Sequence, residues 1–121
     1  MDNETIRELF LSKEFEKFYS TLNAKVQLKF QYTMDVVRTI KILSQKFVKH
    51  LDGTDLYEMR VSVGTNEYRT ILFAIDNDNI ISCQKILLLN AFLKKDTKDY
   101  RKQIKIANNI LRRYKDGEDE Q

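Results

Sequence analysis

Four cations stand where the chain could bring them together on a sheet. Arg60 and Arg69 each lie inside a short apolar stretch, and Lys94 and Lys95 end a longer apolar run that begins at Ile80. An arginine keeps its charge at all relevant pH values and offers two donors to a phosphate, which suits a transition state in which negative charge grows. These residue types therefore predict a phosphate site, with Glu58 on the same strand face as Arg60.

Three kinds of chemistry are open to such a set of cations. RNA carries its own nucleophile, because a 2′-hydroxyl held in line with the neighbouring phosphate needs only orientation, charge stabilisation and a proton acceptor. A basic sheet can equally bind RNA without cutting it, or bind an acidic helix of a partner protein. The residue pattern alone leaves these three alternatives open.

Several other chemistries lack the residues that they need. His50 is the only histidine and Cys83 the only cysteine, so the sequence predicts no metal site. The three glycines are scattered and form no phosphate-cradling loop, and His50 has no supporting triad motif. We expect no cofactor, a solvated His50, and a Cys83 that is buried within an apolar strand.

The elements that would position the cations form one α+β domain. Residues 56–63 alternate between apolar and polar side chains, and with 68–75 and 80–95 they predict an antiparallel meander whose turns lie at 52–55, 64–67 and 76–79. Upstream, a strand at 6–11 leads into two helices that begin at Ser12 and near Val26. The second helix is expected to reach Leu43, and the pair predicts an antiparallel helical hairpin.

The positive charge is concentrated near the C-terminus. Residues 81–115 carry ten Lys and Arg against two Asp and Glu, while residues 116–121 carry four acids and no base. Asp96 and Thr97 can cap a last helix with one apolar and one basic face. The basic face predicts either a polyanion partner or a solvated surface. We assign residues 1–115 to the folded domain and 116–121 to an acidic disordered tail.

The bulk composition is that of a folded soluble protein. The 121 residues are 42% hydrophobic and 32% charged, with a net charge of +3. No apolar run approaches the roughly 18 residues of a membrane span, and no signal segment follows the acidic N-terminus. We therefore expect a cytoplasmic protein without a membrane partner.

Three segments together resemble one known family. They are HLDGTDLYEMRV at 50–61, EYRTILF at 67–73 and LLLNAFLKK at 87–95. In order and spacing they resemble the RelE/HigB toxins, in particular the phage-derived Gp49-like branch. The resemblance covers nearly the whole chain, and it implies a RelE-like fold in which the N-terminal strand and helical hairpin pack on a twisted antiparallel sheet.

The resemblance also implies an activity and partners. It implies the toxin of a type II toxin–antitoxin module, an mRNA endoribonuclease (mRNA interferase) that cleaves ribosome-bound mRNA by metal-independent attack of the 2′-hydroxyl. The expected partners are the cognate antitoxin, with a helix-turn-helix domain, and mRNA on the ribosome. Two alternatives stay open: a ParE-like toxin that inhibits DNA gyrase by binding it, and an RNA-binding regulator without turnover.

Carried over by position, the resemblance gives each candidate residue a role. Arg60 and Arg69 would bind the phosphate in the transition state, and Lys94 and Lys95 would bind RNA or assist proton transfer. Glu58 would orient Arg60, accept a proton, or form a structural ion pair. The residues expected to bind RNA beyond these are Asn90, Lys98, Arg101, Lys102 and Lys105.

The sequence departs from the family pattern in two places. Asn90 and Ala91 stand where many relatives carry His-Gly, and a proline that often follows the lysine pair is missing. Asparagine can donate and accept hydrogen bonds but cannot relay a proton at neutral pH. We therefore expect a mechanism that relies on charge and positioning more than on acid–base help.

Overall fold

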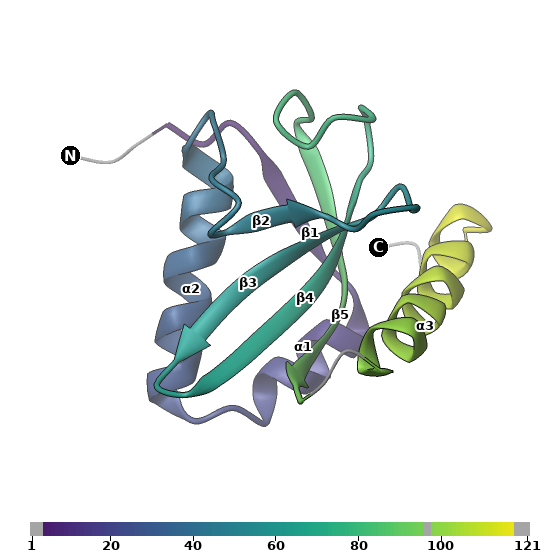
Figure 1. Ribbon diagram of the computed structural model, residues 1–121. Coiled ribbons are helices and arrows are strands. Elements are labelled where there is room, and N and C mark those ends of the chain that lie inside the picture. The colour runs from purple at the N-terminus through teal and green to yellow at the C-terminus, as the bar shows by residue number, and fades with distance from the viewer. Residues whose placement is uncertain (1–3, 96–97, 118–121) are drawn as a thin grey trace.

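The computed structural model describes residues 4–95 and 98–117 of the chain, in which five strands form one sheet and three helices pack on it (Figure 1). The strand order across the sheet is β1-β5-β4-β3-β2. The elements in chain order are β1 (Glu8–Leu11), α1 (Lys13–Ser20), α2 (Ala24–Thr39), β2 (Val48–His50), β3 (Tyr57–Val63), β4 (Asn66–Ala74), β5 (Lys85–Lys94) and α3 (Lys98–Lys115).

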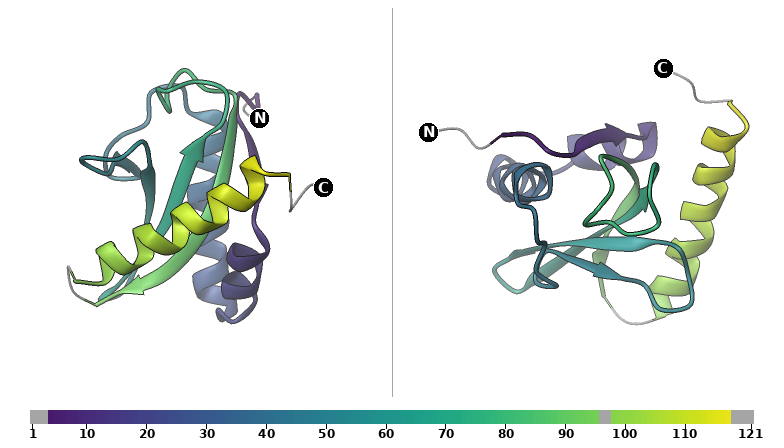
Figure 2. Two further views of the ribbon diagram at one scale, coloured as in Figure 1. Left: turned by 90° about the vertical axis from the view of Figure 1, so that its right-hand side faces the viewer. Right: turned by 90° about the horizontal axis from the view of Figure 1, so that it is seen from above.

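Helices cover both faces of the sheet, and each side has its own apolar core (Figure 2). On one side, α1 and α2 bury aromatic side chains such as Phe15 and Phe30 against the sheet. On the other side, α3 packs Ala107, Ile110 and Leu111 against residues of β4 and β5. This α+β arrangement confirms the predicted fold class and the C-terminal helix.

The predicted meander of three antiparallel strands is present at the centre of the sheet. β3 pairs with β4, and β4 pairs with β5, in antiparallel registers. The β3–β4 connection is a two-residue turn in which Gly64 has a φ of +61°, a conformation that glycine adopts without the strain of a side chain. β1 adds to the far edge of β5 in parallel, and the short β2 adds to β3.

The strand predicted at 80–95 begins only at Lys85, so the prediction for its first five residues was wrong. Residues 80–84 instead form a turn, which the Asp76 carboxylate closes by accepting hydrogen bonds from the backbone N–H groups of Gln84 and Lys85. Cys83 therefore lies in a turn, not in a strand. The expectation of burial was right, since Cys83 is 2% exposed and lies in the core.

A second correction concerns the end of α2, which is Thr39 rather than Leu43. Ile40 takes an extended backbone conformation and ends the helix. The carbonyl groups of Val37, Ile40 and Lys41 then accept hydrogen bonds from the buried guanidinium of Arg7, at 2.7–2.9 Å. Those carbonyls are satisfied by a side chain, so the helix needs no further turn at this end.

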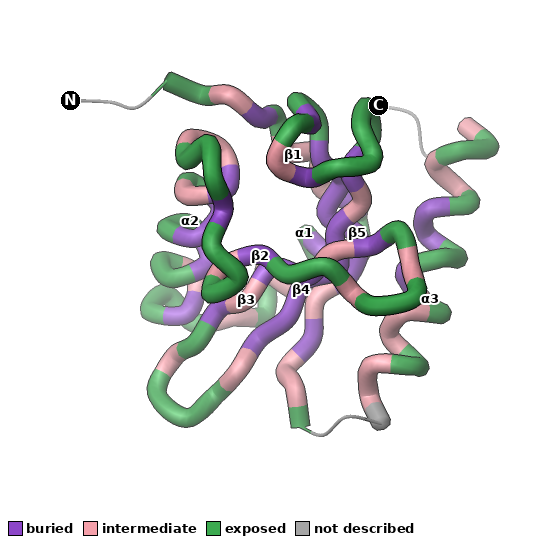
Figure 3. Tube along the Cα trace, turned by 45° about the horizontal axis from the view of Figure 1, so that its top comes forward, coloured by how far each residue is buried: buried purple, intermediate pink, exposed green. Residues whose placement is uncertain are grey.

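β5, like its neighbour β4, is buried along most of its length (Figure 3). Residues 86–90 are all buried, because β5 lies between β1 and β4 and is covered on both faces by helices. Ser12, the N-cap of α1, donates a hydrogen bond to the Leu89 carbonyl and so joins the helix to this strand. The strand that leads to Lys94 is thus rigidly held.

Candidate functional site

The register of β3 and β4 brings the two predicted arginines together. Arg60 lies directly opposite Arg69, and like charges in this position repel each other. Glu58 lies between them: its Oε2 is 3.3 Å from Arg60 Nε, and its Oε1 is 3.7 Å from Arg69 Nε. The carboxylate is 3% exposed, so it is a buried anion that both guanidinium groups neutralise.

A tyrosine from α3 completes this cluster. The Tyr100 hydroxyl donates to Glu58 Oε1 at 2.6 Å and accepts from Arg69 Nε at 3.0 Å. Burial, followed by the hydrogen bond to the Glu58 carboxylate, raises the pKa of Tyr100 to about 12. Tyr100 therefore keeps its proton at neutral pH and links α3 to the charged residues of the sheet.

The two arginines differ in how far they reach the surface. Arg69 is 4% exposed, and its Nη1 donates to Glu67 Oε1 at 3.2 Å and to the Tyr68 carbonyl at 3.0 Å. The Arg60 side chain is 29% exposed, and its Nη1 donates to the Gln45 carbonyl at 3.3 Å. Arg60 is thus the more accessible of the two guanidinium groups, while Arg69 is buried.

The lysine pair lies at the end of β5 beside the same cluster. Lys94 is half-buried and is paired in register with Glu67, and its Nζ lies 5.7 Å from the centroid of the Tyr100 ring. Lys95 is exposed. The structure therefore brings Lys94 to the face of the sheet that carries Arg69, as the meander predicted, and beside Tyr100, which the meander did not predict.

Asn90 is buried under α3, where little of its side chain is open to a direct contact with RNA. It is 5% exposed, and its Nδ2 donates to the side-chain oxygen of Gln103 at 2.8 Å. Its Oδ1 is buried and has no hydrogen-bond partner within the described part of the chain. The role of Asn90 in RNA binding stays a prediction.

The basic face of α3 is exposed where it is described. Arg101, Lys102 and Lys105 are exposed, whereas the side chain of Lys98 lies outside the described residues, as do the expected caps Asp96 and Thr97. Of the expected tail, residues 118–121 also lie outside, and Asp116 and Gly117 form a turn after α3. Lys98, Arg101, Lys102 and Lys105 stay predicted RNA contacts.

Sequence reasoning missed Tyr100 and Glu67 as members of the cluster. Tyr100 fits the apolar stripe of the last helix, and nothing in that pattern shows that its hydroxyl meets a buried carboxylate. Its place five residues after the lysine pair was the available signal, because the first turn of the helix has to lie near the end of β5.

Metal-binding clusters and membrane-spanning helices are both absent from the described part of the chain. Among residues 4–95 and 98–117, no three His, Cys, Asp or Glu side chains gather closely enough to hold a metal ion. None of the helices described there has the length and apolar character to span a bilayer. His50 lies apart on β2, where Nε2 contacts the Thr54 carbonyl at 2.6 Å.

The arrangement can stabilise a developing negative charge without a metal. Two guanidinium groups and an ammonium group lie on one face of the sheet around Glu58 and Tyr100. The buried carboxylate contacts both arginines, and the phenol contacts Arg69. Such preorganised cations lower the barrier of a phosphoryl reaction because they need no rearrangement when charge develops.

Comparisons with known proteins give the chain's relatives. A family model described as "Phage derived protein Gp49-like (DUF891)" matches residues 4–112. A solved structure of a mutant E. coli toxin RelE in the free state is similar at a TM-score of 0.58 and 14% identity, over 84% of this chain and 97% of that one. The intact E. coli RelBE toxin–antitoxin complex gives a TM-score of 0.52 and 13% identity, over 73% of this chain and 96% of that one. No curated protein matches the chain.

Proposed function

The chain belongs to the family of phage-derived Gp49-like proteins, and from this membership and its RelE fold we propose that it is the toxin of a type II toxin–antitoxin module and a metal-independent mRNA endoribonuclease. The observation that carries the proposal is that Arg60 and Arg69 contact the buried Glu58 while Lys94 lies beside Tyr100 on the same face of the sheet. Cations in this arrangement support a phosphate as the ligand.

In the proposed reaction the RNA supplies the nucleophile. The 2′-oxygen attacks the neighbouring phosphorus, the 2′-hydroxyl loses its proton to an acceptor, and the bond to the 5′-oxygen breaks as that oxygen gains a proton. The products are a 2′,3′-cyclic phosphate and a 5′-hydroxyl. In this proposal Arg60 and Lys94 bind the phosphate oxygens as their charge grows, and the buried Arg69 adds positive charge beside Glu58.

Glu58 acts in this proposal through the arginines. Its Oε1 accepts a hydrogen bond from the Tyr100 hydroxyl, its Oε2 lies against Arg60 Nε, and the side chain is almost wholly buried. A carboxylate held in this way is a positioning residue, since both of its oxygens already have partners. Lys95 is exposed at the end of the same edge and is proposed to bind RNA.

The proposed partners follow from the same family. One similar structure is that of the E. coli RelBE toxin–antitoxin complex, which supports a cognate antitoxin as the partner of this chain. We propose that this antitoxin carries a helix-turn-helix domain, that the substrate is mRNA bound to the ribosome, and that the protein acts in the cytoplasm.

The experiment that tests the proposal is induction of the protein alone, followed by mapping of mRNA 5′ ends. Growth arrest with new 5′ ends inside translated codons is the expected outcome, and intact transcripts contradict it. Arg60→Ala should abolish the new ends. Arg112→Ala is the matched control, because it removes an exposed arginine of α3 about three turns from Tyr100.

Two alternative functions give different results in the same experiment. A ParE-like toxin inhibits purified DNA gyrase, leaves transcripts intact and stays toxic when Arg60 and Arg69 are replaced by alanine. A non-catalytic RNA-binding regulator is not toxic when overexpressed. The burial of charge around Arg69 favours the nuclease, because a protein-docking surface needs no such preorganised cluster.

A further inference from the structure

A hollow lies beside Arg60, between β3 and α2. It has a volume of ≈ 510 Å³, within the range of about 300–1,000 Å³ that small-ligand sites occupy. It opens between α2, the segment before β2, and the part of β3 beyond the end of β2. The lining residues are Lys29, Tyr32, Thr33, Lys46, Phe47, Arg60 and Ser62.

The lining of this hollow combines positive charge with exposed aromatic surface. Lys29, Lys46 and Arg60 are its charged residues, and no carboxylate is among the lining residues. Tyr32 is 58% exposed, an unusual degree for an aromatic side chain, and its ring lies 6.3 Å from that of Phe47. The Lys46 ammonium group lies 5.6 Å from the Phe47 ring. Cations beside an open aromatic face are the elements of a single-stranded nucleic acid site.

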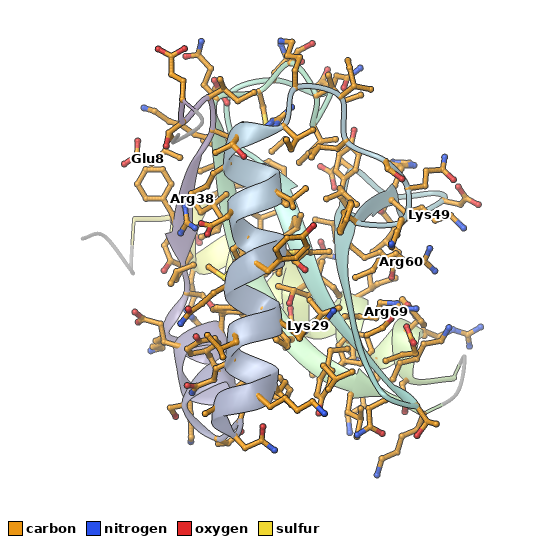
Figure 4. The ribbon with its side chains drawn as sticks, turned by 90° about the vertical axis from the view of Figure 1, so that its left-hand side faces the viewer. Glu8, Lys29, Arg38, Lys49, Arg60 and Arg69 are labelled. Atoms are coloured by element: carbon orange, nitrogen blue, oxygen red, sulfur yellow. The ribbon has the colours of Figure 1, made fainter. Side chains whose placement is uncertain are left out.

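Arg60 connects the hollow to the candidate site. Its Nε faces the Glu58 carboxylate and is buried, with no hydrogen-bond partner among the described residues, while the same side chain lines the hollow. Figure 4 shows Lys29 on the side of α2 that faces β3, with Arg60 and Arg69 beyond it. A phosphate bound at Arg60 would lie at the rim of the hollow, because Arg60 is one of its lining residues. The nucleotide next to that phosphate would then lie over the hollow.

We propose that this hollow binds the nucleotide next to the cleaved phosphate, in single-stranded RNA. The base stacks on the exposed ring of Tyr32, and Lys29 and Lys46 bind the flanking phosphates. This inference rests on the proposed nuclease function and adds to it a subsite on α2, outside the cluster around Glu58. Stacking on tyrosine accepts every base, so the hollow supplies affinity and register and little sequence preference.

The test is the binding of a fluorescent single-stranded RNA whose 2′-hydroxyls are methylated, so that no cleavage can occur. Tyr32→Ala should weaken binding about 10-fold, as the loss of one base–aromatic stack does, whereas Tyr32→Phe should bind as the wild type does. The double variant Lys29→Ala/Lys46→Ala should lower the slope of log affinity against log salt by about 0.7 for each phosphate that the protein no longer neutralises.

Two matched controls separate the hollow from general effects. Leu28→Ala removes an exposed apolar side chain of α2 that does not line the hollow, and Lys13→Ala/Lys17→Ala removes two exposed charges of α1. Both should bind the RNA as the wild type does. Melting temperatures equal to that of the wild type show that the exposed Tyr32 was replaced without unfolding the chain.

The outcomes distinguish this inference from the proposed function. If the wild type cuts mRNA and the Tyr32→Ala and double-lysine variants bind the methylated RNA unchanged, the hollow is not a subsite although the nuclease function stands. If these variants lose binding while the wild type cuts no mRNA, the hollow binds RNA and the nuclease proposal fails. A wild type that does not bind the methylated RNA overturns the inference.

Discussion

At the scale of single residues, the cluster of Glu58, Arg60, Arg69 and Tyr100 shows how a buried carboxylate can hold two like charges together. Arg60 and Arg69 are opposed in the sheet, and each is close to Glu58. Tyr100 adds a donor to the carboxylate and an acceptor for Arg69. The geometry of the proposed phosphate ligands therefore depends on two residues that need not contact RNA.

The ionisation of Tyr100 gives a prediction about stability at high pH. The folded pKa of about 12 exceeds the ordinary value of 10.0, so the stabilisation is fully present below pH 10 and is lost as pH rises towards 12. The difference in unfolding free energy between the wild type and Tyr100→Phe should shrink over this range, as urea unfolding at several pH values would measure. A constant difference between pH 9 and 12 would show that Tyr100 titrates normally.

A second prediction compares Asn90 with Arg60. Arg60→Ala should lower single-turnover cleavage by about 100-fold or more, the usual effect of removing a charge-stabilising donor. Asn90→Ala should cost less than about 10-fold, because Asn90 is bound to Gln103 under α3 and cannot relay a proton. The reverse ranking would contradict a mechanism based on charge and positioning.

At the scale of elements, α3 is fixed at both ends. Tyr100 binds the charged cluster near its start, and Arg113 near its end makes a two-pronged ion pair with Glu14 of α1, at 2.6 and 2.8 Å. Between them, Ala107, Ile110 and Leu111 are buried against the sheet. Arg113 therefore has a structural role, unlike the exposed basic residues Arg101, Lys102 and Lys105 of the same helix.

The Glu14–Arg113 pair predicts a stability difference at acid pH. The hydrogen bonds from Arg113 hold the pKa of Glu14 below its ordinary value of 4.5, against the opposing effect of burial. The stabilisation is thus present above pH 4.5 and is lost as pH falls through the folded pKa. Glu14→Gln should cost about 1 kcal/mol at pH 7 and much less at pH 3, measured by urea unfolding. An equal cost at both pH values would contradict the ion pair.

The same scale shows which elements a local pattern could predict. The alternation in residues 56–63 fixed the face of Glu58 and Arg60 correctly, because only one side of that pattern is apolar. In β4 the sequence could not show which residues share a face, because both faces are apolar. Ile71 is buried in one core, and its neighbour Leu72 is buried in the other. The three-residue β2 and the parallel pairing of β1 with β5 depend on long-range hydrogen bonds that no local window contains.

The candidate site divides in the same way. Arg60, Arg69 and Glu58 were predictable, since the two-residue turn between β3 and β4 sets the register of these strands. The exact register of Lys94 was not, because ten residues join β4 to β5 and their pairing shifts between Thr70 and Leu72. Tyr100 was not, because its position beside Glu58 depends on where α3 docks. The strand start at Ile80 was also wrong for a long-range reason: the apolar residues there do enter the core, but Asp76 and Arg7 fix the backbone as a turn.

At the scale of the whole molecule, Arg7 joins three distant segments. Its buried guanidinium donates to carbonyls at the end of α2 and to those of Ile80 and Ile81 in the turn before β5. Arg7 is the residue before β1, and it is 1% exposed. One residue thus ties the start of the chain, the end of α2 and the turn before β5 together.

Replacing Arg7 by methionine should therefore destabilise the entire fold. It leaves several buried carbonyls without donors, which should cost about 3 kcal/mol or more of unfolding free energy. Arg38→Met is the matched control, since the Arg38 side chain pairs with the exposed Asp35 in α2 and should cost less than about 1 kcal/mol. Equal losses in the two variants, measured by denaturant unfolding, would contradict this role of Arg7.

Cys83 is the only thiol of the chain, so the rate of its alkylation can measure how often the core opens. It lies in the core beside the segment that Arg7 holds, and burial raises the pKa of its thiol. An alkylating reagent can react with it only during moments when this core opens, because the reactive thiolate requires water. The rate at which intact protein gains a single alkyl group, followed by mass, therefore reports how often the molecule opens, without any introduced label.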